Sequence, residues 1–310
     1  MITATNLRMK NTPALNFELA QGLTHGLVGA NGVGKTTLLR MMAGQFPSMG
    51  LRVFGEEPFD NQRVMDRTIL MGIDNPLFDG WNVKKLFRIS QVRWKTWNQD
   101  RADELVDAFE LPVQNYSSLS RGQKSAMGFI FAVASGCELM LLDEPYLGLD
   151  VQRRQVFFDV MREEQGTRTI VVSTHHLSEI EGYLDTILLL SDEPLSGPID
   201  EIVDSIVAVS GHASQLDRAL GRLQLPVLAR ESSTLADRAI IDARPKFAQC
   251  VFDQAKDLGL RAQEVTLEEA VLALEEAWCD CSFRSSRRIH LSSTASCCCC
   301  GASSRLSRVR

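Results

Sequence analysis

Three groups of residues have types and spacings suited to phosphate chemistry. The first comprises Gly29, Ala30, Asn31, Gly32, Val33, Gly34, Lys35, Thr36 and Thr37. This run fits GxxxxGK[ST], follows an apolar segment and precedes a run with helical spacing. Gly32 and Gly34 let backbone amides curl around phosphate oxygens, where a Cβ would obstruct the approach. Lys35 places positive charge on the terminal phosphates, and the Thr36 hydroxyl is a ligand for Mg²⁺. We therefore predict a nucleotide-phosphate site.

The second group is a pair of acids after an apolar run. Residues 139–142 predict a buried strand that ends at Asp143 and Glu144. An aspartate at a strand end beside a phosphate loop can hold Mg²⁺ through water, and the adjacent glutamate can polarise an attacking water. Acids are common at strand ends, so the pair gains its meaning from its position relative to Lys35 and from the following Pro145.

The third group is LSRGQ, at residues 119–123. Its polar part consists of Ser120, Arg121, Gly122 and Gln123. Alone, this run predicts only a helix that begins at a serine cap. It gains a functional meaning because it lies about 20 residues before the acid pair.

The elements that position these groups indicate an α/β fold with a mixed sheet core. Candidate strands are residues 23–28, 139–142 and 169–173, and the last two lack polar alternation, which is typical of central strands covered on both faces. Residues 75–136 are mainly helical and indicate an inserted helical subdomain. Within it, residues 100–109 are amphipathic, with Leu105, Val106 and Phe109 on one side.

We expect the first domain to span residues 1–210. Residues 211–278 predict a small α+β unit with helices at 213–223 and 245–258, followed by a capping box at Thr266 and Glu269 that opens a helix to about residue 277. Residues 279–310 hold six arginines against one acid, nine serines and six cysteines. That composition predicts a disordered tail.

Composition and charge argue against several classes of protein. The 310 residues carry a net charge of −6 and are 45% hydrophobic, which excludes global disorder. The acidic balance argues against a nucleic-acid binder. No window approaches the roughly 18–20 apolar residues of a membrane span, and no signal peptide is apparent. Only two cysteines precede residue 279, as in a reduced compartment. We expect a cytoplasmic protein, held at the membrane only through a partner.

Together, the phosphate loop, LSRGQ, LLLDEP, GLD and STH in this order resemble the nucleotide-binding subunit of an ABC transporter. The resemblance covers about residues 1–210. Trp97, the paired histidines and LEEAVLALEE resemble bacterial exporter-type subunits, whose membrane domain is a separate chain. The resemblance implies a P-loop ABC cassette that binds ATP and Mg²⁺, pairs head to tail with a second ATP-binding subunit (a homodimer) and drives transmembrane permease chains.

The resemblance also implies roles for single residues. Glu144 would be the general base, Asp143 the Mg²⁺ partner through water, and His175 the switch that orients the γ-phosphate and the attacking water. His176 is the less favoured neighbour. Asp150 matches the loop that crosses the dimer interface. The signature residues Ser120, Gly122 and Gln123 would contact the γ-phosphate bound to the partner, with Arg121 standing where glycine is common.

Two departures from the family pattern bear on the site. Asp74 aligns where a glutamine is common, and it is either a further approach to Mg²⁺ or a loop residue that caps the following Asn75 and Pro76. Residues 1–17 also contain no tyrosine or tryptophan to stack on adenine, so Met9 or Lys10 is the expected substitute.

Other hypotheses remain open from the sequence. The aromatic residues Phe78, Trp81, Trp94 and Trp97 either fill the core of the helical subdomain or border a groove for a membrane partner. A soluble ABC ATPase acting on DNA or ribosomes is a second functional class, disfavoured by the single phosphate loop and the acidic charge. A nucleotide-dependent regulator with little turnover is a third, disfavoured by the intact Lys35, Glu144 and His175.

Overall fold

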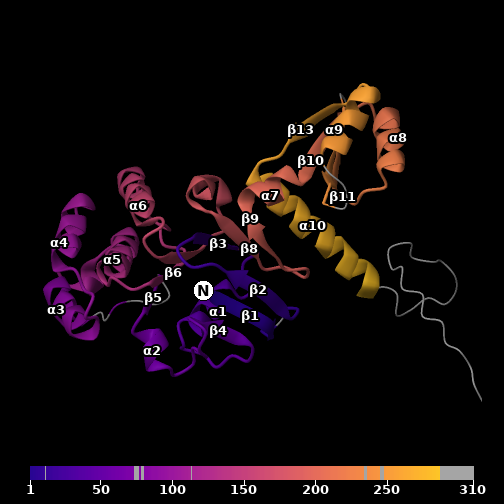
Figure 1. Ribbon diagram of the computed structural model, residues 1–310. Helices are drawn as coiled ribbons and strands as arrows, with labels where there is room; N and C mark the ends of the chain where they lie inside the picture. The colour runs from indigo at the N-terminus through magenta and orange to yellow at the C-terminus, as the bar shows by residue number, and fades with distance from the viewer. Residues whose placement is uncertain are drawn as a thin grey trace, which may run out of the picture.

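The computed structural model describes residues 1–10, 12–72, 77, 80–112, 114–233, 236–244 and 248–286. A six-stranded sheet forms the centre of the molecule (Figure 1). In spatial order its strands are β5 (Thr68–Gly72), β6 (Leu139–Asp143), β7 (Thr169–Ser173), β3 (Thr24–Val28), β8 (Thr186–Leu189) and β9 (Leu195–Pro198). All neighbouring pairs are parallel except β8 and β9. The predicted α/β fold with a mixed sheet is therefore observed.

The central strands are buried on both faces, as the absence of polar alternation predicted. Leu139 and Leu141 of β6 pack into one core, together with helix α1 (Lys35–Met42). Met140 and Leu142 pack into a second core on the opposite face of the sheet. Successive side chains of a strand point to opposite faces, so an apolar run is what a strand between two cores requires.

A second, antiparallel sheet covers α1 on the side away from the main sheet. Its strands, in spatial order, are β2 (Leu15–Leu19), β1 (Ile2–Leu7) and β4 (Leu51–Val53). Leu38, Leu39 and Met42 of α1 are fully buried between the two sheets. The short helix α2 (Gln62–Met65) follows β4. This packing holds the first turn of α1 at the carboxyl end of β3.

The helical subdomain packs on the opposite face of the main sheet. It consists of α3 (Val83–Arg93), α4 (Gln99–Ala108), the 3₁₀ turn η1 (Tyr116–Ser118) and α5 (Arg121–Ala134), and is followed after β6 by α6 (Val151–Glu164). Asn82, Asn98 and Ser120 cap the three helices through their side-chain oxygens. Leu105, Val106 and Phe109 are buried, which confirms the predicted apolar side of α4 and the residue that follows it.

The tryptophans pack against the core of this subdomain. Trp97 lies 5.6 Å from Phe87 and 5.4 Å from Phe131 between ring centroids, and it stacks on Trp94 at 6.5 Å. Trp81 is partly buried against the same core. Phe78 lies outside the described residues. Trp97, which contacts three aromatic rings, therefore helps to fill the core of the helical subdomain.

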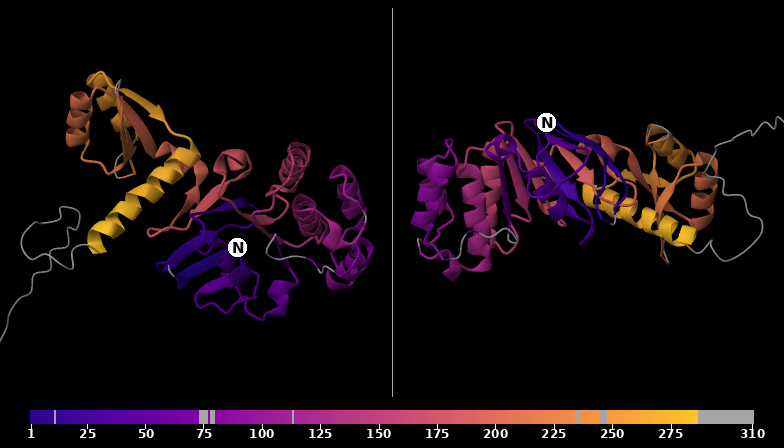
Figure 2. Two further views of the ribbon diagram at one scale, coloured as in Figure 1. Left: turned by 180° about the vertical axis from the view of Figure 1, so that it is seen from behind. Right: turned by 90° about the horizontal axis from the view of Figure 1, so that it is seen from below.

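A four-stranded antiparallel sheet forms a separate unit toward the C-terminus (Figure 2). Its strands, in spatial order, are β11 (Val227–Ser232), β12 (Asp237–Asp242), β10 (Ile206–Gly211) and β13 (Arg261–Glu264). Helices α8 (Ala213–Leu223) and α9 (Ala248–Asp257) cover one face. Strand β10 begins before residue 211, the expected start of this unit. The connecting elements are the 3₁₀ turns η2 (Leu177–Glu179) and η3 (Glu181–Tyr183) and helix α7 (Ile199–Asp204).

Helix α10 (Leu267–Ser286) begins where this unit meets the first domain and packs against β11, α7 and η2 (Figure 1). Thr266 and Glu269 exchange side-chain-to-backbone hydrogen bonds at 3.2 and 3.3 Å, which confirms the predicted capping box. The helix extends to Ser286, so residues 279–286 are helical, contrary to the disorder that their composition predicted, and residues 287–310 of the predicted tail lie outside the described residues. Within the described residues, no helix is long and apolar enough to cross a bilayer.

His25 of β3 is a buried polar residue, and both of its ring nitrogens have hydrogen-bond partners. Its Nε2 lies 2.8 Å from the carbonyl oxygen of Ala20, and its Nδ1 lies 2.6 Å from Oγ1 of Thr186. A carbonyl only accepts, so Nε2 carries the proton and Nδ1 accepts from the threonine hydroxyl. Burial lowers the pKa of His25 below its usual 6.5. The neutral ring is therefore the form that the fold stabilises.

We expect the stability contributed by His25 to depend on pH. Since the unfolded chain takes up a proton near pH 6.5 and the folded chain resists it, this contribution is present above that pH and declines below it. Thermal unfolding of wild type and His25→Gln between pH 7.5 and 5.5 should show a stability gap that narrows on acidification. His212→Gln, at an exposed position, is the control. A gap independent of pH would contradict this account.

Candidate active site

The loop between β3 and α1 has the backbone geometry of an anion cradle. Gly29, Gly32 and Gly34 have φ angles of 148°, 80° and 117°, values that side chains rarely adopt. A Cβ on Gly29 would lie 2.5 Å from the carbonyl oxygen of Leu190, whereas one on Gly32 would meet open space. No side chain caps the amino end of α1, so its first amides remain directed at the loop. The predicted phosphate site thus has both the amides and the room.

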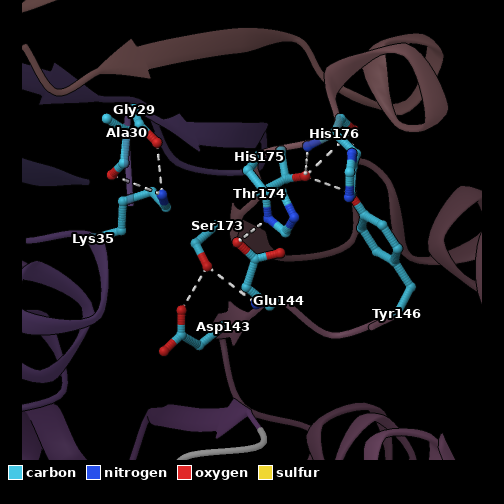
Figure 3. A network of polar contacts seen from close by, with 10 residues as sticks. All are labelled: Gly29, Ala30, Lys35, Asp143, Glu144, Tyr146, Ser173, Thr174, His175 and His176. Atoms are coloured by element: carbon cyan, nitrogen blue, oxygen red, sulfur yellow. Dashed lines mark hydrogen bonds and ion pairs between the residues drawn. The ribbon is translucent and has the colours of Figure 1, made fainter. Parts of the chain in front are cut away.

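Lys35 folds back over this loop (Figure 3). Its Nζ donates hydrogen bonds to the carbonyl oxygens of Gly29 at 2.6 Å and Ala30 at 3.3 Å, and the side chain is buried. Burial lowers the pKa of Lys35, while the carboxylates of Glu144 and Asp143 oppose that shift. The ammonium is therefore held at the phosphate loop by two backbone carbonyls.

Ser173, at the end of β7, joins the two acids. Its Oγ donates to Asp143 Oδ1 at 2.6 Å and accepts the backbone N–H of Glu144 at 3.0 Å. Glu144 has a φ of 50°, a conformation that costs a non-glycine residue about 1 kcal/mol or more. Sequence reasoning assigned Ser173 no role, although a serine at a strand end before two histidines was a usable signal. The hydroxyl sets where each carboxylate points.

His175 and Glu144 form a pair in which Nδ1 lies 2.8 Å from Oε1. An ionised carboxylate only accepts, so Nδ1 carries the proton and Nε2 faces away from Glu144. Both side chains are partly exposed, and the pair lies beside Lys35 and Asp143 (Figure 3). The arrangement orients a carboxylate base with a ring nitrogen available beyond it. The ring of His176 lies 3.9 Å from that of His175 and has no contact with Glu144 among the described residues.

Tyr146 is a second residue that the sequence did not reveal as part of the site. Its hydroxyl hydrogen-bonds to the Thr174 hydroxyl and lies 3.2 Å from the carbonyl oxygen of His176. Burial raises the pKa of Tyr146 to about 12, so it stays protonated at neutral pH. The phenol therefore ties the loop after Glu144 to the loop that carries His175.

The residues present fit a bound Mg²⁺. Asp143 is buried, its Oδ1 is oriented by Ser173, and among the described residues no donor reaches its Oδ2. The described part of the chain holds no cluster of three acidic, histidine or cysteine side chains that could hold a metal ion by themselves. Asp74, predicted as a further metal approach, lies outside the described residues.

The signature residues lie on the helical subdomain. Ser120 caps α5, and its partner Gln123 completes a capping box, with bonds of 3.3 and 2.9 Å. Arg121 is exposed. A Cβ on Gly122 would lie 2.1 Å from the carbonyl oxygen of Gly148. No contact among the described residues joins the signature to the phosphate loop of the same chain.

Asp150 lies in the loop that Gly122 packs against. It caps α6 by accepting the N–H of Arg153 at 2.9 Å, a bond that lowers the pKa of Asp150. Met9, one of the two residues expected to pack on adenine, lies next to the phosphate loop. Its Cε is 3.1 Å from the position that a Cβ on Gly34 would take. Lys10 is exposed.

The comparisons with known proteins agree with this fold. Residues 13–147 match the family described as ABC transporter. The chain is 28% identical over 222 residues to the ABC transporter ATP-binding protein YtrB of Bacillus subtilis, covering 69% of this chain and 76% of the relative. It is 27% identical over 284 residues to the daunorubicin resistance ATP-binding protein DrrA3 of Streptomyces coeruleorubidus, covering 85% and 89%.

A solved structure described as a putative cobalt transport ATP-binding protein superposes with a TM-score of 0.58 at 23% identity, covering 80% of this chain and 94% of that one. This likeness concerns the fold. Fold and site define a P-loop ATPase cassette. Residues 13–147 form an ABC transporter domain, and the relatives that align over most of the chain are named as ATP-binding proteins, which confirms the prediction made from the motifs.

Replacement of Glu144 by glutamine should abolish hydrolysis but leave ATP binding intact. The amide keeps the size of the side chain and loses the basic oxygen that faces His175, so turnover should fall about 100-fold or more. Phosphate release and nucleotide titration on the same preparation measure both quantities. Glu264→Gln, on the exposed face of β13, is the matched control. Unchanged turnover in Glu144→Gln would remove this residue from the role of base.

Proposed function

We propose that this chain hydrolyses ATP to power transport through a separate membrane-spanning partner. The observation that carries the proposal is the convergence of Lys35, Asp143 and the Glu144–His175 pair at the carboxyl ends of neighbouring strands. The relatives named as transporter and resistance ATP-binding proteins support the coupling to transport, and the latter supports export. The protein would lie on the cytoplasmic face of the membrane through that partner.

The hydrolysis step follows from the positions of the side chains. The amides of the loop and the Lys35 ammonium bind the terminal phosphates and offset the charge that develops there. Glu144 accepts a proton from the attacking water, and His175 keeps the carboxylate aimed at it. Mg²⁺, held by Thr36 and through water by Asp143, would neutralise phosphate charge when bound. None of these groups supplies a covalent bond to phosphate.

Two copies of the chain are proposed to enclose ATP between them. Ser120 and Gln123 lie at the amino end of α5, which carries a partial positive charge suited to a phosphate. Because this end has no described contact with the phosphate loop of its own chain, a second copy is the natural source of its ligand. Asp150, on the loop beneath Gly122, would lie at the same interface.

Purified Glu144→Gln should shift from monomer to dimer when Mg·ATP is added. Blocked hydrolysis would keep ATP in place, so light scattering should report twice the mass. Lys35→Ala, which lacks the ammonium, should stay monomeric and serves as the control. A Glu144→Gln protein that binds ATP and stays monomeric would contradict the homodimer.

A groove beside α3 is the proposed contact for the membrane partner. It has a volume of about 920 Å³ between α2 and the end of α3. Its lining includes Ile89 and Val92, which are 39% and 84% exposed, and the Arg93–Asp66 ion pair at 2.6 Å. Phe59, also exposed, lies in the adjoining hollow. Apolar side chains rimmed by charges suit the docking of a short helix.

Val92→Glu should reduce membrane attachment without altering the ATPase activity of the isolated chain. The substitution places a charge in the apolar part of the groove, far from Lys35. Met49→Glu, at an equally exposed apolar residue between α1 and β4, is the matched control. The two variants are compared by the membrane-bound fraction after expression with the native membranes. Equal attachment of both would exclude this groove as the docking contact.

A further inference from the structure

Helix α10 forms one wall of a cavity whose other wall is the phosphate loop. The cavity has a volume of about 220 Å³ and opens beside His175. From the cassette it is lined by Val28, Gly29, Ala30, Asn31, His175 and Leu177. From α10 it is lined by Glu268, Val271, Leu272 and Glu275. A C-terminal helix is therefore part of the surroundings of the nucleotide site.

The position of α10 is set by close packing. Leu267, Ala270, Val271 and Leu274 are buried in the same core as Val28 of β3 and Leu177 of η2. The residues that face the cavity recur at three, four and seven positions after Glu268, which places them on one face of a helix. The two carboxylates are thus held, two turns apart, on the face directed at the loop.

These carboxylates have no counter-ion of their own. Within the described residues, neither Glu268 nor Glu275 forms an ion pair, whereas Glu269 on the same helix pairs with Arg238 at 3.1 Å. Burial raises the pKa of Glu275, and the positive charge of Lys35 opposes that shift. The two side chains therefore interact electrostatically. Negative charge on α10 therefore faces the place where the terminal phosphates would bind.

We propose that Glu268 and Glu275 make α10 an electrostatic restraint on nucleotide binding, one that disfavours ATP more than ADP. ATP carries one phosphate more than ADP, and the added charge would lie nearest Lys35, whose ammonium Glu275 attracts, while Glu268 adds like charge to the same cavity wall. The other side of α10 shares its core with Ala208, Leu228 and Ile240 of the C-terminal sheet. Displacement of that sheet would therefore move the restraint. This inference rests on the proposed function of the site.

The test compares Glu268→Gln/Glu275→Gln with wild type in the full chain. The Kd values for Mg·ATP and Mg·ADP are measured by calorimetry. Removing both charges should tighten ATP binding by roughly threefold or more, with a smaller change for ADP. Glu276→Gln, exposed on the same helix, is the control and should bind like wild type. Unchanged or weaker ATP binding in the double variant would overturn the proposal.

Two further comparisons separate the possible failures. Thermal unfolding of each variant shows whether α10 remains docked, and the single variant Glu275→Gln replaces the double variant if the latter does not fold. A merely structural role would change affinity for both nucleotides alike, which would also contradict the proposal. If the wild type binds no ATP, the proposed function itself fails. If it binds ATP and the variants match it, only the role of α10 fails.

Discussion

The parallel pairing of β6 with β7 is the constraint on which the site depends. In this register Asp143 lies opposite Ser173, and Ser173 lies opposite Leu27 of β3, directly before the phosphate loop. Three carboxyl ends therefore meet at one edge of the sheet. The Ser173 hydroxyl can bond both to Asp143 and to the backbone of Glu144 only because the strands are aligned in this way. A shift by one residue would turn these side chains toward the opposite face.

Burial on both faces keeps that register in place. Leu139 and Leu141 enter one core while Met140 and Leu142 enter the other, so a slip would disturb two cores together. Apolar packing on both faces of the sheet thus offsets the free-energy cost of holding polar groups at its edge. Lys35 is held in a similar way, because its buried ammonium donates hydrogen bonds to two backbone carbonyls of the loop.

Local signals accounted for most of the site. The phosphate loop and the acids after residues 139–142 could be predicted because their backbone demands and apolar runs lie within short stretches of chain. The roles of Ser173 and Tyr146 could not, because each acts through partners brought together by strand order. Helix α10 was predicted from its capping box, but its contact with the loop depends on how the C-terminal sheet packs, which periodicity does not encode.

The close approach of Gly122 to Gly148 has a mechanical consequence. A backbone carbonyl occupies the space where a side chain at residue 122 would stand, so the start of α5 and the loop before α6 cannot slide past each other. Ser120, which caps α5, and Asp150, which caps α6, are thereby held at a fixed separation. A force that displaces the helical subdomain would therefore move both helix caps together.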